Sequence, residues 1–297
     1  KRIDVMRILL KLESTRDQVY QLDYHYSVQG FIYNMLKGSR FEDLHDKDGY
    51  KFFCFSNIFP YSSMMKKGER KYLLISSPST DLIMHIAERV REHKRVKEVI
   101  SIGDMRFLIN GLKIIRYTLN KSQFTFIAAT PIIVRIPKEK YIDLNLKHSY
   151  NYLYWRRDYP LELFIRQLED NLYKKYKMYT GLDIENNVRE EIESTRSNHD
   201  MVDGSNDSVI AEVSNNKNNP NGHIINKLMF IKQIAKEIHV HGNKHIVIGT
   251  LWRFWFNLEQ YERCSAILKL LQFALDVGLG ERNSLGFGFM NIRKSYK

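Results

Sequence analysis

Cysteine is scarce in this 297-residue chain, which contains only Cys54 and Cys264. Two thiols so far apart exclude a disulfide framework and a cysteine-ligated zinc site, and they suit a reducing compartment. Long apolar runs are also missing, since no run reaches the about 18 residues that a membrane span requires. The first residues show no apolar core of a signal peptide. These absences predict a cytoplasmic, globular protein without a membrane partner.

Acidic residues are outnumbered, with 34 Asp and Glu against 46 Lys and Arg, and the formal net charge is +12. An excess of this size favours polyanionic partners, meaning nucleic acid or an anionic membrane surface. Residues 181–223 depart from this pattern, because they hold nine acidic and three basic residues and few large apolar side chains. Such a segment buries too little surface to offset the cost of ordering. We expect a mobile insertion there.

Hydrophobic periodicity predicts an α+β fold. In the first part of the chain, strand-like segments and amphipathic helices alternate in the order β-α-β-β-α-β, the ferredoxin-like arrangement. The predicted strands are residues 2–12, 51–55, 71–76 and 100–117, and the predicted helices are residues 26–37 and a segment that begins at Ser79 or Thr80.

The same order recurs in the second part of the chain. Its predicted strands are residues 123–136, 228–234, 246–256 and 287–292, and its predicted helices are residues 160–177 and a segment around residues 267–274. With a boundary near Asn120, this predicts two tandem ferredoxin-like, RRM-like domains, residues 1–120 and 121–297.

The segment GLGERNSLGFG, residues 278–288, contains four glycines in eleven positions. It follows a predicted helix and leads into a predicted strand, whereas Rossmann and P-loop phosphate cradles follow a strand and open a helix. Three interpretations remain. The glycines can form a helix C-cap with a strand bulge, or a backbone nest that binds an anion with Arg282 and Ser284 as donors. Residues 285–292 also partly match an RNA-recognition strand.

The pattern G-x-G-x-x-x-x-x-G-x-G, on a basic chain with two ferredoxin-like halves, resembles the CRISPR-associated endoribonucleases that cut repeat RNA, the Cas6 family of the RAMP superfamily. The resemblance implies cleavage without a metal or other cofactor, by attack of a 2′-hydroxyl on the adjacent phosphate to leave a 2′,3′-cyclic phosphate and a 5′-hydroxyl. It also implies an RNA-binding loop formed by Gly278, Gly280, Arg282, Asn283, Ser284, Gly286 and Gly288. The implied partners are CRISPR precursor RNA, its cleaved repeat product, an interference complex that receives it, and a second copy of the chain.

Family members often place a Tyr on the first helix, a His in the following loop and a Lys at the start of the next strand. Tyr33, His45 and Lys51 occupy those places here. By the resemblance, His45 transfers a proton, as general acid to the departing 5′-oxygen. Tyr33 orients or deprotonates the 2′-hydroxyl, and Lys51 contacts the scissile phosphate. For each residue alone, a solvated loop or half-buried surface position is the structural alternative, and Lys47 competes for the role of Lys51.

Other clusters allow further interpretations. His239, His241 and His245 lie around a predicted hairpin turn without a local carboxylate or cysteine, so we expect no metal site there. The aromatic run from Tyr152 to Trp155 suits either base stacking or hydrophobic anchoring. Two other functions stay open: a non-catalytic repeat-RNA-binding protein, and a structural ribonucleoprotein subunit in which the glycine loop only packs.

Overall fold

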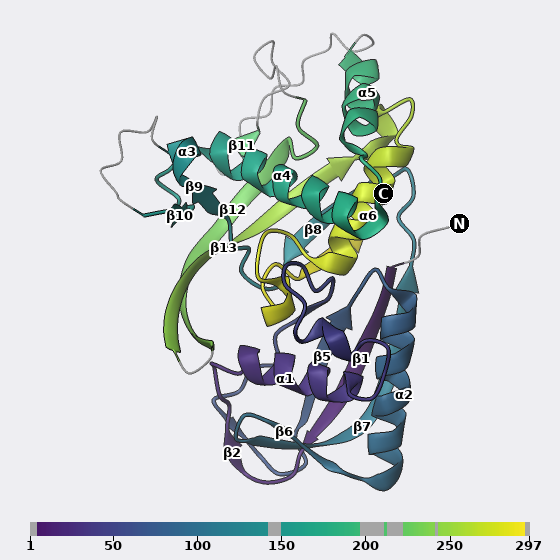
Figure 1. The fold of residues 1–297 in the computed structure, drawn as a ribbon, viewed down its shortest axis with the longest axis vertical. Helices are drawn as coiled ribbons and strands as arrows, with labels where there is room; N and C mark the ends of the chain where they lie inside the picture. The colour runs from purple at the N-terminus through teal and green to yellow at the C-terminus, as the bar shows by residue number, and fades with distance from the viewer. Residues whose placement is uncertain (1–4, 142–149, 197–210, 213–221, 241–242, 295–297) are drawn as a thin grey trace.

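The computed structural model describes residues 5–141, 150–196, 211–212, 222–240 and 243–294. The described residues form a mixed α and β molecule with two five-stranded antiparallel sheets, which lie one above the other along its long axis (Figure 1). The first sheet uses strands from residues 5–117 and the second uses strands from residues 123–294. Within these residues no helix has the length and apolar character needed to span a bilayer.

The first sheet has the strand order β3-β5-β1-β7-β6. Its strands are β1 (Val5–Ser14), β3 (Cys54–Phe55), β5 (Arg70–Ser76), β6 (Val99–Ile102) and β7 (Met105–Tyr117). Helices α1 (His25–Leu36) and α2 (Thr80–Val96) pack against it, and β2 (Gln18–Val19) pairs with β4 (Met64–Met65) at its edge. The Ser79 hydroxyl, at one of the two predicted start positions of this helix, caps α2 by accepting a hydrogen bond from the Leu82 amide at 3.2 Å.

The second sheet has the order β11-β12-β13-β8-β14. Its strands are β8 (Gln123–Ala128), β11 (Ala211–Glu212), β12 (Lys227–Val240), β13 (Asn243–Asn257) and β14 (Met290–Lys294). Around it lie α3 (Lys138–Tyr141), α4 (Leu161–Thr180), α5 (Glu185–Arg196), α6 (Ser265–Val277) and a small sheet of β9 (Arg135–Pro137) and β10 (Tyr152–Tyr154). In the first sheet the four strands β1, β3, β5 and β7, numbered one to four in chain order, lie in the order two, three, one, four. In the second sheet β8, β12, β13 and β14 lie in the same order. The two halves therefore repeat one spatial order.

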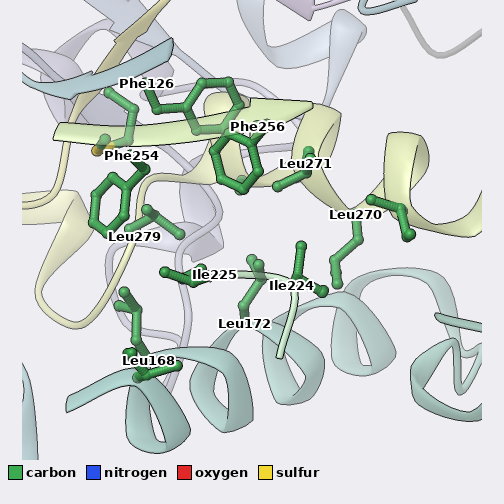
Figure 2. Close-up of a cluster of buried hydrophobic side chains, with 14 of the residues drawn as sticks. Phe126, Leu168, Leu172, Ile224, Ile225, Phe254, Phe256, Leu270, Leu271 and Leu279 are labelled. Carbon is green, nitrogen blue, oxygen red and sulfur yellow. The ribbon is translucent and has the colours of Figure 1, made fainter. Parts of the chain in front are cut away.

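The core of the second half lies between its sheet and helices α4 and α6. Figure 2 shows aromatic rings from the sheet facing leucines of both helices, with Ile224 and Ile225 between them. Phe254 from β13, Leu168 from α4 and Leu270 from α6 are fully buried. Burial of side chains of this size contributes about 1.5–3 kcal/mol each, so this layer holds α4 and α6 in fixed positions.

Strands β12 and β13 run well beyond the predicted residues 228–234 and 246–256. Their backbones stay paired out to Val240 and Asn243. Apolar side chains become sparse there, since Ile238 is buried but Glu237, Lys244 and His245 are exposed, so hydrophobicity alone ends the strands too early. The extended ribbon curls away from the second sheet and reaches α1 of the first half (Figure 1).

The prediction of a mobile insertion over residues 181–223 is wrong for residues 185–196, which form helix α5. Ile184, Val188 and Ile192 are buried at a spacing of four residues, so even this sparse stripe suffices to dock the helix. The Glu191 carboxylate accepts hydrogen bonds at 3.0 Å from the first amides of α6, those of Ala266 and Ile267. Residues 197–210 and 213–221 lie outside the described residues.

Candidate active site

The structure brings Tyr33, His45 and Lys51 together. Tyr33 lies on α1, His45 directly follows a short 3₁₀ helix (Glu42–Leu44), and Lys51 precedes β3. The rings of Tyr33 and His45 are nearly perpendicular, with centroids 5.0 Å apart. The Lys51 ammonium donates a hydrogen bond to the His45 carbonyl at 3.1 Å and a second to the Lys47 carbonyl. The three residues therefore form one cluster at the edge of the first half.

Backbone geometry places Lys51 outside the sheet. The sequence predicts a strand over residues 51–55, but β3 begins only at Cys54. Phe52 interrupts the extended backbone with a φ of 52°, in the left-handed region that side chains other than glycine rarely adopt. Its ring lies 5.1 Å from that of Tyr179 at the end of α4. This turn leaves Lys51 in a loop where its side chain can face a ligand.

His45 is accessible and has one nitrogen committed. Its side chain is 62% exposed, and Nδ1 lies 2.5 Å from the Asp46 carboxylate. A carboxylate only accepts hydrogen bonds when ionised, so this contact makes Nδ1 the donor. Nε2 is then the atom of His45 that can exchange a proton with another molecule. Imidazole is the side chain best suited to that exchange near neutral pH.

The surroundings of Tyr33 and Lys51 bear on their chemistry. Burial and, to a smaller extent, the nearby Tyr26 raise the pKa of Tyr33 to about 12. Tyr33 is therefore a neutral phenol at neutral pH and can donate a hydrogen bond. Burial lowers the pKa of Lys51, while the carboxylates of Asp48 and Asp46 raise it.

A pocket joins Lys51 to the glycine loop. Its lining consists of residues 49–53, Lys175, Val277 and residues 282–284. His45 contacts Lys51 and the Tyr33 ring contacts that of His45, but neither residue is part of this lining. The predicted catalytic lysine and the predicted RNA-binding residues Arg282, Asn283 and Ser284 thus face one space, although they come from opposite halves of the chain.

The glycines of the loop are buried, and their conformation sets its shape. Gly278, Gly280, Gly286 and Gly288 all have positive φ angles between 68° and 84°. A Cβ atom on Gly286 would overlap the ring of Phe55, and one on Gly288 would overlap the Leu279 carbonyl oxygen. Only glycine adopts a positive φ without strain and has no Cβ atom to overlap these neighbours. Arg282 and Ser284 are partly exposed, so the loop presents these side chains on a backbone that the glycines allow.

The predicted site residues do not include Lys175, which lies near the end of the predicted helix over residues 160–177. It is fully buried on α4, and its ammonium donates hydrogen bonds to Gly278 O, Gly280 O and Asn283 Oδ1 at 2.6, 3.0 and 3.0 Å. Burial lowers the pKa of Lys175 to about 7, while Cys54 and Glu281 raise it. The available signal was periodicity, because position 175 continues the buried stripe of α4.

The match of residues 285–292 to an RNA-recognition strand is wrong for its aromatic side chains. Phe287 and Phe289 are buried, and the Phe287 ring stacks on His25 with centroids 4.9 Å apart. The Arg7 guanidinium covers Phe289 at 4.5 Å. Neither ring can accept a base, and both instead hold the loop against the first half.

The remaining candidates are the aromatic run from Tyr152 to Trp155 and the three histidines around the predicted hairpin turn. Trp155 is buried, whereas Tyr152 and Tyr154 are partly exposed. His245 is exposed, and His241 lies outside the described residues. Over the part of the chain that the structure describes, no three His, Cys, Asp or Glu residues are grouped to hold a metal ion.

Comparison with known proteins gives consistent results. Residues 115–292 match the family described as CRISPR associated protein Cas6, C-terminal. Over 289 residues, 96% of this chain and 99% of the relative, the sequence is 31% identical to CRISPR-associated endoribonuclease Cas6 2 of Methanocaldococcus jannaschii. It is 27% identical to CRISPR-associated endoribonuclease Cas6 of Haloferax mediterranei, over 98% of this chain and 95% of that protein.

Solved structures share the fold over nearly the whole length. A RAMP protein described as binding different RNA substrates superimposes with a TM-score of 0.62 at 21% identity, covering 97% of this chain and all of that one. The product of a Cas6-related gene from Pyrococcus furiosus gives a TM-score of 0.62 at 19% identity, over 98% of this chain and all of that one. At these identities the likeness concerns the fold.

Proposed function

The chain belongs to the Cas6 family of CRISPR-associated endoribonucleases, and on that premise we propose that it cuts CRISPR precursor RNA beside the pocket shared by Lys51 and the glycine loop. The proposal rests on one observation. Lys51, Arg282 and Ser284 line the same pocket, and the exposed side chain of His45 lies next to it. The repeated strand order supports two ferredoxin-like halves that meet near Asn120.

The proposed reaction is an in-line displacement at phosphorus. The 2′-oxygen loses its proton to solvent water and bonds to the neighbouring phosphorus, and the bond from phosphorus to the 5′-oxygen breaks. The phenol of Tyr33 orients the 2′-hydroxyl by hydrogen bonding. The protonated imidazole of His45 gives its Nε2 proton to the departing 5′-oxygen, leaving a 2′,3′-cyclic phosphate and a 5′-hydroxyl.

Cationic groups stabilise the charge that develops on the phosphate. Lys51 supplies an ammonium beside His45, and Arg282 faces the same pocket from the glycine loop. The proposed mechanism needs no metal ion, because protein groups protonate the departing 5′-oxygen and stabilise the charge on the phosphate. The binding energy comes largely from such phosphate contacts, so affinity for RNA should fall steeply with salt.

The test uses repeat RNA in two forms, native and with a 2′-deoxynucleotide immediately 5′ of the cut. We expect the wild-type chain to cut native RNA equally well with and without EDTA, and to leave the deoxy form intact. His45→Ala should lower the single-turnover rate by about 10²–10⁴-fold with little change in Kd, because it removes the proton donor only. His93→Ala, which changes a histidine paired with Glu98 at the end of α2, is the matched control.

Three outcomes would refute the proposal: cleavage of the deoxy form, inhibition by EDTA, or full activity of His45→Ala. Tight binding of repeat RNA without any cleavage by the wild-type chain would instead favour a non-catalytic RNA-binding protein.

A further inference from the structure

We propose that Tyr152 and Arg135 form a stacking platform for one unpaired RNA base, connected to the cleavage pocket through Arg282. The platform lies on the small sheet of β9 and β10, outside the pocket lining. The inference rests on the proposed function and extends it, because it requires that the bound RNA is single-stranded beside the cut.

Strand pairing places the platform residues on one face of the small sheet. Arg135 is opposite Tyr154, and Ile136 is opposite Leu153. Successive side chains of a strand point to opposite faces, so Tyr152 and Tyr154 share the face of Arg135. Ile136 is buried on the other face and Leu153 packs against the same core. The hydrophobic side thus anchors the sheet and leaves Tyr152 and Arg135 on the other face, where Tyr154 packs against a second buried cluster.

The outward surface is open enough for a ligand. Tyr152 is 37% exposed, and the Arg135 side chain is 38% exposed. The Arg135 guanidinium lies 4.7 Å from the centroid of the Tyr152 ring, and Tyr154 contacts that ring edge-on at 5.6 Å. A base can stack on an aromatic ring or on an arginine plane. Because the guanidinium lies over one face of the Tyr152 ring, the base would use a face that this contact leaves uncovered.

The platform is ordered before RNA binds. The Glu281 carboxylate pairs with the Arg135 side chain, and the Glu281 amide donates a hydrogen bond to Ile133 O at 2.9 Å, next to β9. Fixing a binding surface in advance reduces the entropy lost on association. Because Glu281 already neutralises Arg135, this guanidinium is better suited to stacking than to holding a phosphate.

Arg282 links the platform to the site of cleavage. It directly follows Glu281 and lines the pocket together with Lys51. A hydrogen bond with Tyr154 lowers the pKa of Tyr152, and the charges of Arg135 and Arg282 lower it further, so Arg282 lies within electrostatic reach of the platform. An RNA strand held by a phosphate at Lys51 can therefore pass Arg282 and place a neighbouring base on Tyr152.

The chemistry favours an unpaired ribonucleotide over a duplex. Bases in an A-form helix are stacked on one another, and proteins read such helices mostly through phosphates and 2′-hydroxyls. Cationic grooves lined with aromatic side chains are typical of single-strand binding, where each stacked base contributes about 1–3 kcal/mol. The combination of Arg282 with Tyr152 and Arg135 has this composition.

The experiment measures the Kd of the full-length chain for repeat RNA that carries the uncleavable 2′-deoxynucleotide. We expect Tyr152→Ala to weaken binding about 5- to 150-fold, which corresponds to the loss of one stacked base. Tyr152→Phe keeps the ring and should bind nearly as the wild type does. The control is Tyr61→Ala, which removes a ring that is 64% exposed in the first half of the chain.

An abasic scan separates stacking from a structural effect. Bases next to the cut are removed one at a time, and each RNA is titrated against the wild type and Tyr152→Ala. Removal of one particular base should weaken wild-type binding and leave binding by Tyr152→Ala unchanged. If every base removal costs the two proteins the same factor, or if Tyr152→Phe binds as poorly as Tyr152→Ala, the platform does not exist.

The outcomes also separate this inference from the proposed function. Binding with the expected coupling but without cleavage of native RNA would support the platform and refute the nuclease. Cleavage without the coupling would refute the platform alone, and a wild-type chain that binds no repeat RNA would refute both.

Discussion

Replacing Gly288 with alanine adds one methyl group at the most crowded turn of the glycine loop. The backbone at Gly288 has a φ of 71°, where alanine is disfavoured by roughly 1–2 kcal/mol. The new Cβ would overlap the Leu279 carbonyl oxygen and lie 2.9 Å from Asn283 Nδ2. The Leu279 amide donates to the Gly288 carbonyl at 2.9 Å, so the backbone at Leu279 and the backbone at Gly288 cannot move apart without losing that hydrogen bond.

Gly38 provides a matched control, because it has the same φ of 71° and no neighbouring atom within 4 Å of the place that a Cβ would occupy. Gly38→Ala should therefore show only the left-handed penalty of roughly 1–2 kcal/mol. Overpacking of a closed site costs about 1–3 kcal/mol more. We expect Gly288→Ala to lower the free energy of unfolding by about 2–5 kcal/mol in total, and the difference between the two variants isolates the steric overlap.

Urea denaturation followed by circular dichroism measures both variants on one scale, provided that the slopes of the transitions agree. Equal losses for Gly38→Ala and Gly288→Ala would refute the argument that close packing demands glycine at position 288. RNA affinity is then measured at a temperature where Gly288→Ala is still folded. Affinity that falls there shows that the shape of the loop serves RNA binding, whereas affinity that is unchanged favours a loop that only packs.

Two further predictions concern charged groups. Lys51→Ala should reduce the cleavage rate by about 10²–10³-fold, as expected for the loss of one stabilising charge. Lys47→Ala should change the rate little. Equal effects of the two variants in single-turnover assays would contradict the proposed role of Lys51. Burial and Lys236 lower the pKa of His25 to about 3 from 6.5, so below pH 6.5 the unfolded chain binds a proton that the folded protein does not. Stability should therefore fall by about 4 kcal/mol between pH 6.5 and 3 from this group alone. Urea midpoints of His25→Asn that decline as steeply as those of the wild type would contradict this.

The sequence predicted those features in which local pattern and burial agree. The stripe of α2, which begins with Ile83 after the Ser79 cap, is buried as its spacing indicates. The predicted β-α-β-β-α-β elements occur in this order in both halves, but with β2, β4 and β6 added in the first half and β9, α3, β10, α5 and β11 added in the second. Tyr33, His45 and Lys51 were placed by a family resemblance, and the structure brings them together; their roles stay predictions.

Other features depend on tertiary contacts that no local pattern contains. Helix α5 is stabilised by Val188 and Ile192 packing against the core and by Glu191 capping α6, although its composition resembles a disordered segment. Phe287 has the sequence context of a base-stacking ring, yet His25 covers it. Lys175 has the composition of a surface residue, but three backbone and side-chain acceptors hold it inside the protein.

The candidate site lies where the two halves meet, and buried side chains of the first half contact the glycine loop there. The Cys54 thiol of β3 donates to Phe287 O at 3.3 Å, across 233 positions of sequence. His25 on α1 pairs with Leu285 O at 2.7 Å and with Lys236 from the curled ribbon. The Cys54 and Leu285 contacts fix the loop to the first half, and the Lys236 contact fixes the curled ribbon to α1. Because Lys51 and Arg282 reach the pocket from opposite halves, a small shift between the halves would separate the two cations, so these buried contacts keep the site assembled.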